Sequence, residues 1–435
     1  MNIFIMGQCT LHWGRMEYGN IGNYYIMEPF FRELHRAFPG ASIRTTMQMS
    51  DRFCQAEKLT VVPMSLYYGW QDSDLSQAEH ELALAREFAE TGTLSETTPY
   101  IEEVLNADLI IDFSGDIWGA NADFLGPDRF QVGLCKDRVA QLLGKKVVML
   151  AGSPGPFSNH HSLELAREVF ANFDLVTNRE PVSTPLLEQE GFDVSHTHSL
   201  ACPAFMFEPA EQVDLKAMMV EEGVNVADGK PVVGFVLCGW NFERGPFDLW
   251  PRDDADYIKF AEAVEYITET LGARVCLMSH SNGFDVAPAP FVLKHGRDYP
   301  ITKQLESVLQ KRGISQDFFS LNGVYDAWQT KAILGQFDML VSGRIHAAVA
   351  GLSQQVPTVI IDYGHEPKAH KLAGFAQVAG AEQYVADPAK GDELKAYIER
   401  CWHERAEFTE RLAARMPQVA AQVRKNFQLL QDLMA

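Results

Sequence analysis

The sequence predicts an α/β protein with two Rossmann-like domains built on parallel sheets, followed by C-terminal helices. Short apolar runs alternate with longer amphipathic segments along most of the 435 residues. This alternation is typical of parallel sheets that helices cover on both faces. A chain of this length is also longer than a domain with one ordinary hydrophobic core. The alternation restarts after an irregular acidic segment at residues 208–230, which indicates two domains.

Each predicted strand is a short apolar run that turn residues follow. In the first half we expect strands at residues 2–7, 107–113, 146–151 and 174–177. In the second half we expect them at residues 231–237, 274–278, 337–341 and 357–362. The helical patterns between them cover residues 24–38, 129–143, 162–170, 255–271 and 344–352. Residues 401–434 contain no glycine and a single proline, Pro417, and this composition predicts one or two long helices.

These patterns divide the chain into three predicted parts. An N-terminal Rossmann-like domain covers residues 1–210, a C-terminal one covers residues 228–400, and a helical segment covers residues 401–435. In open α/β sheets, ligands bind beyond the carboxyl ends of the strands. We therefore expect the functional residues in the loops that follow the strands.

The composition excludes several classes of function. The chain is 46% apolar and 22% charged, as in soluble globular proteins, and its net charge of −21 disfavours nucleic-acid binding. Its seven cysteines form no C-x-x-C pair, so neither a zinc site nor a disulfide framework is predicted, in keeping with a cytoplasmic protein. The sequence predicts no metal and no cofactor. The N-terminus does not resemble a signal peptide, and no apolar run is long enough to span a bilayer, so we expect at most peripheral membrane contact.

The segment from Ser342 to His346 is the most informative stretch. It follows an apolar strand pattern, turns at Ser342 and Gly343, and enters an Ala-rich helix. That geometry directs helix N–H groups and the positive end of a helix at one point. Arg344 can grip a phosphate or carboxylate with two parallel hydrogen bonds, and His346 is suited to proton transfer. The alternative is a helix with a solvated arginine and a histidine that serves only structure.

Three further loops follow predicted strands. Asn20 lies in a Gly-Asn-x-Gly-Asn loop that can cap a helix or bind a ligand, although its spacing does not match dinucleotide binders. Gly155 lies in a Gly-Ser-Pro-Gly-Pro loop. Arg179 would be a second guanidinium at a strand end; the alternative is an arginine paired with the adjacent surface glutamate.

Two more side chains and one aromatic cluster complete the candidates. His280 ends a predicted strand and can bind substrate or satisfy loop backbone groups. Lys368 follows another strand and can add positive charge to an anion pocket; its alternative is a solvated lysine. Tyr67, Tyr68 and Trp70 can form a platform for sugar rings, although such clusters more often lie in the core.

Taken in order, these segments resemble the polysaccharide pyruvyl transferase family. The Gly19–Asn23 loop, the strand with its small-residue turn at 108–115, the Gly-Pro loop at 152–157, Arg179 with Ser183, and His280 match the family pattern. The most specific match is the Ser-x-Arg-x-His helix, with the proline strand, tyrosine and lysine that follow it, which here are Ser342, Arg344, His346, Pro357, Tyr363 and Lys368.

The resemblance implies a GT-B-like fold and transfer of the enolpyruvyl or pyruvyl group of phosphoenolpyruvate onto saccharide hydroxyls. The product would be a pyruvate ketal in cell-surface polysaccharide biosynthesis. His346 and Arg344 would be catalytic, with His346 as general acid or base. Donor and substrate contacts would come from Arg179, Lys368, Asn20, His280, Ser342, Gly343 and Gly155. A lipid-linked acceptor would place the protein at the inner face of the cytoplasmic membrane.

Three departures from the family pattern bear on the acceptor side. Asn23 replaces an aspartate, residues 112–116 replace a run of glycines, and Cys202 stands where Asp-Pro is common. Two alternatives therefore stay open: a nucleotide-sugar glycosyltransferase of the same architecture, and a non-catalytic binding protein derived from the family. The Glu-rich ribose motif expected of the first is not evident. The oligomeric state also stays open, a homo-oligomer included.

Overall fold

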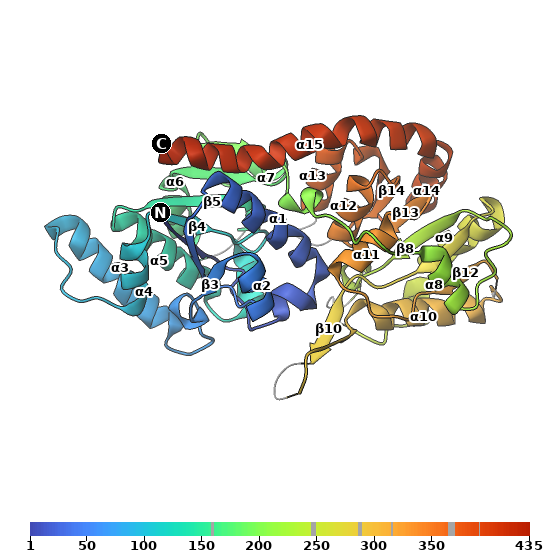
Figure 1. Ribbon diagram of the computed structural model, residues 1–435, viewed down its shortest axis with the longest axis horizontal. Coiled ribbons are helices and arrows are strands. Elements are labelled where there is room, and N and C mark those ends of the chain that lie inside the picture. The colour runs from blue at the N-terminus through green and yellow to red at the C-terminus, as the bar shows by residue number, and fades with distance from the viewer. Residues whose placement is uncertain (158–160, 245–248, 286–288, 315, 364–369, 391) are drawn as a thin grey trace. The chain divides into compact units, whose positions relative to one another are not determined.

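The computed structural model describes residues 1–435 except 158–160, 245–248, 286–288, 315, 364–369 and 391 (Figure 1). The chain forms two compact units. Unit 1 contains Met1–Glu17, Glu28–Pro203 and Ala421–Ala435, and unit 2 contains Tyr18–Met27 and Ala204–Ala420. The helices α1 (Ile21–Ala37) and α15 (Arg405–Met434) thus contribute to both units. The predicted limits 1–210, 228–400 and 401–435 stay predictions, and the units divide the chain differently at residues 18–27 and within α15.

Unit 1 is built on a parallel sheet. Among the described residues the sheet has the strand order β3-β2-β1-β4-β5-β6-β7. Its strands are β1 (Asn2–Met6), β2 (Ser42–Thr45), β3 (Leu59–Val61), β4 (Leu109–Asp112), β5 (Lys146–Gly152), β6 (Leu175–Asn178) and β7 (Thr197–Ser199). Every residue of the central strand β4 is buried, as expected for a strand that helices cover on both faces. The order reverses between β1 and β4, which makes that edge the topological switch point of the sheet.

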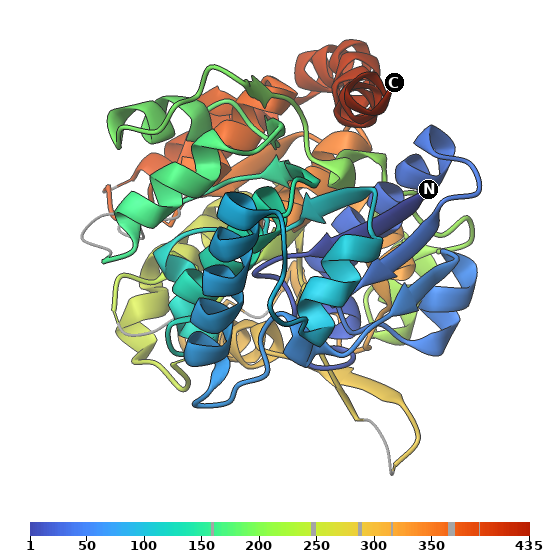
Figure 2. The same ribbon diagram turned by 90° about the vertical axis from the view of Figure 1, so that its left-hand side faces the viewer.

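The helices of unit 1 follow the strands and pack on the sheet. Besides parts of α1 and α15 they are α2 (Asp51–Ala56), α3 (Asp74–Thr91), α4 (Pro99–Asn106), α5 (Arg129–Leu142), α6 (Leu163–Ala171) and α7 (Ser183–Gln189). Local sequence explains the start of α4: Thr98 caps it by accepting a hydrogen bond from Ile101 N, and Pro99 occupies the first turn. Figure 2 looks along α15, with α3, α4 and α5 of unit 1 toward the viewer.

Unit 2 repeats the same topology. Its sheet has the order β12-β9-β8-β13-β14-β15, and its described strands pair in parallel. They are β8 (Val232–Val236), β9 (Arg274–Leu277), β12 (Phe318–Ser320), β13 (Met339–Ser342), β14 (Thr358–Ile361) and β15 (Val385–Ala386). The switch point of this sheet lies between β8 and β13.

Helices and one hairpin complete unit 2. The helices are α8 (Leu215–Glu221), α9 (Ile258–Glu265), α10 (Asp298–Lys311), α11 (Ala327–Leu334), α12 (Ile345–Ser353), α13 (His370–Ala379) and α14 (Glu393–His403). An antiparallel hairpin, β10 (Asn282–Asp285) and β11 (Val292–His295), is inserted between β9 and α10. In Figures 1 and 2 this hairpin extends away from the rest of unit 2.

The predicted fold class is confirmed. All eight predicted strands are strands of the two parallel sheets, and long helices occupy residues 393–434. The sequence did not predict the short outer strands β2, β3, β7, β12 and β15 or the hairpin. These segments are only two to four residues long, and several are half-exposed, so they lack the continuous apolar run by which the others were found.

A pair of buried carboxyl groups lies at the switch point of unit 1. Asp112 ends β4, Asp137 lies on α5, and both side chains are fully buried. Burial raises the pKa of Asp112 to about 7 and that of Asp137 well above its ordinary value, which the adjacent Asp112 charge raises further. Asp112 Oδ2 and Asp137 Oδ1 receive no hydrogen bond from other described groups. A proton shared between the two carboxyls satisfies both.

This pair predicts a pH dependence of stability. In the window between the ordinary carboxyl pKa and the raised values, the folded protein binds more protons than the unfolded chain, so stability falls as pH rises. We expect Asp137→Asn to reduce that fall by about 1.4 kcal/mol per pH unit. Urea denaturation at about pH 5 and about pH 8 measures it. The exposed Asp72→Asn variant is the control, and a fall in Asp137→Asn as steep as in the wild type would contradict the shared proton.

Candidate functional site

The turn after β13 lies at the switch point of unit 2 and has a fixed shape. Ser342 is fully buried; its hydroxyl donates to Arg344 O (2.8 Å) and accepts from Arg344 N (3.2 Å). Gly343 N donates to Val236 O (2.7 Å) at the end of β8. Ser342 thus shapes the turn that begins α12, and this role accounts for its hydroxyl.

Position 343 must be glycine because of Asn241, a residue that was not among the predicted site residues. A Cβ at Gly343 would lie 1.9 Å from Oδ1 of Asn241, so a larger residue does not fit. Asn241 Oδ1 accepts from Cys238 N (2.9 Å), and its amide nitrogen donates to Ile361 O (3.3 Å). One side chain therefore joins the loops after β8, β13 and β14. An asparagine five residues past a strand gives no signal of this in the sequence.

Arg344 forms a buried ion pair with Asp298. Asp298, the first residue of α10, has no exposed side-chain surface, and it accepts from Arg344 Nε (3.0 Å) and from Nη2. Burial by itself lowers the pKa of Arg344, but the Asp298 carboxylate raises it above its ordinary value, so the guanidinium stays charged. Asp298 occupies the Nε–Nη2 edge of the guanidinium, so an anion can be gripped only through Nη1, and the anion-binding role of Arg344 stays a prediction. Nη1 makes no hydrogen bond within the described chain.

His346 lies where two helices begin. It is the second residue of α12, and Gly22 is the second residue of α1. A Cβ at Gly22 would lie 2.5 Å from His346 Nδ1, so the imidazole packs directly on the first turn of α1. The ring also meets the Phe375 ring edge-on at 5.9 Å. The positive ends of α1 and α12 therefore both lie beside this half-buried imidazole.

Asn20 caps α1. Its side-chain oxygen accepts from Gly22 N (3.1 Å), and its carbonyl accepts from Asn23 N (2.9 Å). The helix-capping alternative for the Asn20 loop therefore describes what its side chain does within unit 2. Glycine at position 22 has a specific reason as well, since any side chain there would displace His346.

His280 is buried beside the Arg344–Asp298 pair. Its backbone N donates to Asp298 Oδ2 (3.3 Å), and 1% of the residue is exposed. Burial lowers the pKa of the imidazole to about 3, and the Arg344 charge acts in the same direction, so His280 is neutral at neutral pH. Neither ring nitrogen has a hydrogen-bond partner in the part of the chain that the structure describes.

In unit 1, Arg179 joins three loops at the carboxyl end of the sheet. It is 3% exposed, its Nε donates to Ser153 Oγ (3.0 Å), and its Nη2 lies 3.4 Å from Asp116 Oδ1. The alternative of a surface pair with Glu180 is wrong. Glu180 is buried and instead accepts from Val182 N (2.7 Å) in its own turn.

Gly155 and the aromatic cluster have structural roles in unit 1. Gly155 has φ +106° and donates to Trp118 O (2.8 Å), a conformation that favours glycine. Tyr67 and Tyr68 are each 1% exposed, so these two rings belong to the core, which was the favoured interpretation, and they form no platform for sugar rings. Lys368 lies outside the described residues.

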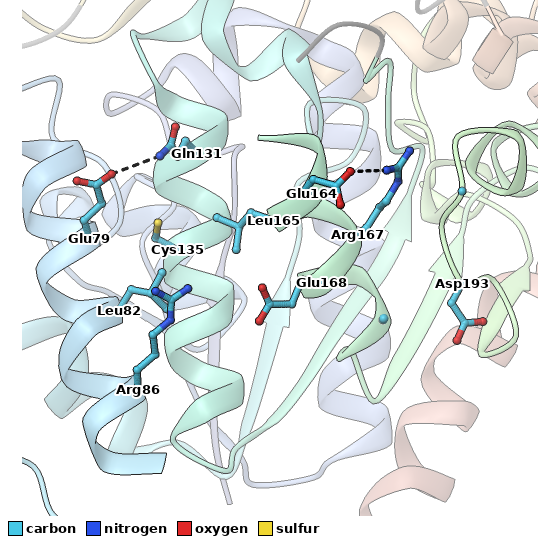
Figure 3. Close-up of a pocket in the computed structure, with 12 residues that line it drawn as sticks. Glu79, Leu82, Arg86, Gln131, Cys135, Glu164, Leu165, Arg167, Glu168 and Asp193 are labelled. Carbon is cyan, nitrogen blue, oxygen red and sulfur yellow. Dashed lines mark hydrogen bonds and ion pairs between the residues drawn. The ribbon is translucent and has the colours of Figure 1, made fainter. Parts of the chain in front are cut away.

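A groove of about 890 Å³ lies on the helices of unit 1 (Figure 3). It runs between α3, α5 and α6, and none of the predicted site residues lines it. Four acidic residues line it against two arginines, and Arg167 is paired with Glu164 (2.7 Å). This acidic excess makes the groove unsuited to a small anion.

Two features of the described residues concern metal binding and membrane insertion. No cluster of His, Cys, Asp or Glu side chains there could hold a metal ion. In the same residues, no helix is both long enough and apolar enough to cross a bilayer.

Comparison with known proteins agrees with the pattern of motifs. A family model described as polysaccharide pyruvyl transferase matches residues 20–365. The amylovoran biosynthesis protein AmsJ of Erwinia amylovora is 22% identical over 291 residues, which cover 66% of this chain and 65% of that protein. The chain thus matches just under two thirds of the length of this curated relative.

Solved structures resemble the fold. A glycosyltransferase from Rickettsia africae superposes with a TM-score of 0.60 at 11% identity, covering 100% of this chain and 98% of that one. HepE of Anabaena, crystallised with UDP, gives a TM-score of 0.56 at 12% identity and covers 99% of each chain. At such low identities these likenesses show the GT-B-like fold alone.

The Arg344–Asp298 pair predicts a large loss of stability on breaking it. Asp298→Ala leaves a guanidinium charge buried without its partner, and we expect the free energy of unfolding to fall by about 3 kcal/mol. Chemical denaturation measures it. Asp254→Ala, which removes the exposed partner of Lys311, is the control and should change stability far less. Equal effects of the two variants would show that the buried pair is not special.

Proposed function

Because the chain belongs to the polysaccharide pyruvyl transferase family, we propose that it transfers the pyruvyl group of phosphoenolpyruvate to a saccharide. Two hydroxyls of the saccharide would form a pyruvate ketal, and inorganic phosphate would be released. The observation that carries the proposal is the meeting of two helix N-termini at His346, with the charged Arg344 two residues away. Positive helix ends, a guanidinium and an imidazole suit a phosphorylated acid that must accept a proton.

The reaction needs one proton at carbon and one new bond to each hydroxyl. The methylene C3 of the donor gains a proton while the first hydroxyl oxygen bonds to C2. The bond from C2 to the phosphate oxygen then breaks, and the second hydroxyl oxygen bonds to C2. Of the two hydroxyl protons released, one balances the proton gained by C3 and the other leaves with phosphate. Positive charge develops at C2 as phosphate departs.

In this proposal His346 donates or relays the proton to C3. The side chain is half-buried and packs between the first turns of α1 and α12, which fixes the ring. General acid catalysis requires such a fixed donor near the reacting carbon. Gly22 serves this arrangement as a positioning residue, because a larger residue would push the ring away.

Arg344 would neutralise the phosphate through Nη1. Asp298 holds the other edge of the guanidinium, so the charge is fixed in place before the donor arrives. A preorganised charge needs no rearrangement when negative charge develops on the leaving phosphate. Backbone N–H groups at the starts of α1 and α12 would add hydrogen bonds to the same anion. Arg179, Lys368 and His280 remain predicted substrate contacts.

The acceptor is the less defined part of the proposal. A saccharide that carries two neighbouring hydroxyls fits the chemistry, and amylovoran biosynthesis is the process named for the relative AmsJ. Action on a lipid-linked saccharide at the inner face of the cytoplasmic membrane would need only peripheral contact with the bilayer.

Thermal-shift measurements separate this function from its nearest rival. Phosphoenolpyruvate should raise the melting temperature, whereas a panel of nucleotide sugars should leave it unchanged. Phosphate release from phosphoenolpyruvate in the presence of saccharide acceptors then tests turnover. Stabilisation by a nucleotide sugar with no response to phosphoenolpyruvate would instead support glycosyl transfer.

Replacing His346 tests its role in proton transfer. His346→Ala should lower the turnover number by about 10²–10⁴-fold, while calorimetric affinity for phosphoenolpyruvate stays close to that of the wild type. His403→Ala, an exposed histidine on α14, is the matched control. Full activity in His346→Ala would refute the assignment.

Gly22 is expected to couple to His346. Gly22→Ala places a methyl group against the imidazole, so turnover should fall by about tenfold or more as the ring moves from its position. Melting temperatures of Gly22→Ala, His346→Gly and the double variant form a double-mutant cycle. The glycine at 346 removes every side-chain atom that the new methyl would strike, so the double variant should be more stable than additivity predicts. Additive effects would disprove the contact.

A further inference from the structure

We propose that unit 1 carries a saccharide-binding platform at its own switch point, formed by His12 and Trp13 and supported by Trp70 and Arg129. It rests on the proposed function in one respect, since the saccharide it binds would be the acceptor. The platform does not include Tyr67 and Tyr68, whose rings are buried in the core.

The platform lies on the loop that leaves β1. The loops after β1 and β4 begin side by side at the switch point, where Gln8 N donates to Ser114 Oγ (2.8 Å). From there the β1 loop turns at His12 and Trp13, and Arg15 N donates to His12 O (3.1 Å) to close the turn. Ligands of doubly wound sheets bind outside the strand ends at this point.

A stack of planar groups supports His12. Its imidazole stacks on the Trp70 ring with centroids 4.4 Å apart and an interplanar angle of 23°. The Arg129 guanidinium carbon also lies over the Trp70 ring, 4.9 Å from its centroid. Trp70 is held by a hydrogen bond from its indole N–H to Leu125 O (2.6 Å). Stacking on a fixed indole limits the motion of the His12 ring before any ligand arrives.

Arg129 holds the loop after β1 through hydrogen bonds to its backbone. It is the first residue of α5, is fully buried, and donates through Nη2 to the carbonyls of Gln8 and Thr10. Within the described residues no ion pair neutralises its charge, and the guanidinium lies over aromatic rings, whose quadrupoles stabilise a cation. The loop that presents His12 and Trp13 is therefore preorganised, as binding sites require.

Two aromatic side chains of this region reach the surface. Trp13 is 40% exposed, and Phe124, which precedes the residue that holds Trp70, is 81% exposed. Sugars present apolar C–H faces and polar edges, and aromatic rings flanked by hydrogen-bonding groups match both. In this proposal His12, the residue before Trp13, supplies a hydrogen-bonding group. A neutral saccharide also avoids the repulsion that a net charge of −21 imposes on anionic polymers.

Saturation-transfer NMR with methyl hexosides and short neutral oligosaccharides tests the platform directly. The wild type should transfer saturation to sugar ring protons. Trp13→Ala and His12→Ala should lose that signal, and Trp13→Phe should retain part of it. Trp250→Ala is the matched control, since Trp250 is an exposed tryptophan of unit 2 (54%). Melting temperatures confirm that each variant is folded.

Kinetics give the second readout. With a saccharide that supports phosphate release, Trp13→Ala should raise the KM for the acceptor by about tenfold and leave the KM for phosphoenolpyruvate unchanged. Signals in Trp13→Ala and His12→Ala equal to that of the wild type, or no transfer to any sugar in the wild type, would overturn the platform. Because phosphoenolpyruvate binding and phosphate release are measured separately, failure of the platform and failure of the proposed function are distinguishable.

Discussion

The arrangement of the unit 2 site depends on one buried carboxylate. The Asp298 carboxylate accepts hydrogen bonds from two groups at once, the Arg344 guanidinium and the backbone N–H of His280. It thereby fixes the start of α10, the loop after β9 and the turn after β13 in one position. Since the charge of Arg344 is compensated on one edge only, the site keeps a positive group in place without leaving it isolated in the interior.

Two close contacts at glycines also fix side chains of the unit 2 site in position. Asn241 and Gly343 fit so closely that no side chain larger than hydrogen is possible at position 343, and Gly22 leaves space for the His346 ring in the same way. Both glycines are explained by a side chain that approaches from elsewhere in the fold. A family motif can therefore specify a residue for the space it leaves empty, rather than for a contact with substrate.

Much of the fold was predictable because strands such as β4 and β13 are continuous apolar runs, and such runs report burial on both faces of a sheet. The positions of Arg344, His346 and Arg179 after strands were predictable for the same reason. Their partners were not. Asp298 lies 46 residues from Arg344 in sequence, and its role arises only in the folded chain. That role is made by the first residue of α10 meeting the turn after β13, and nothing local distinguishes Asp298 from other acidic residues at helix starts. The burial of Tyr67 and Tyr68, against the exposure of Trp13, likewise depends on tertiary packing that periodicity does not report.

The long helix α15 has a consequence for how the protein is made. Residues 421–435 belong to unit 1, where Phe427 packs against Phe30 (5.8 Å between ring centroids) and Gln431 donates to Ala37 O (2.8 Å). Leu430 and Asn426 in the same stretch are fully buried. On the ribosome these residues emerge only after all of unit 2 has been synthesised. Unit 1 can therefore complete its core only after unit 2 has been made, so the surface of α1 that Phe427 covers needs protection until α15 arrives.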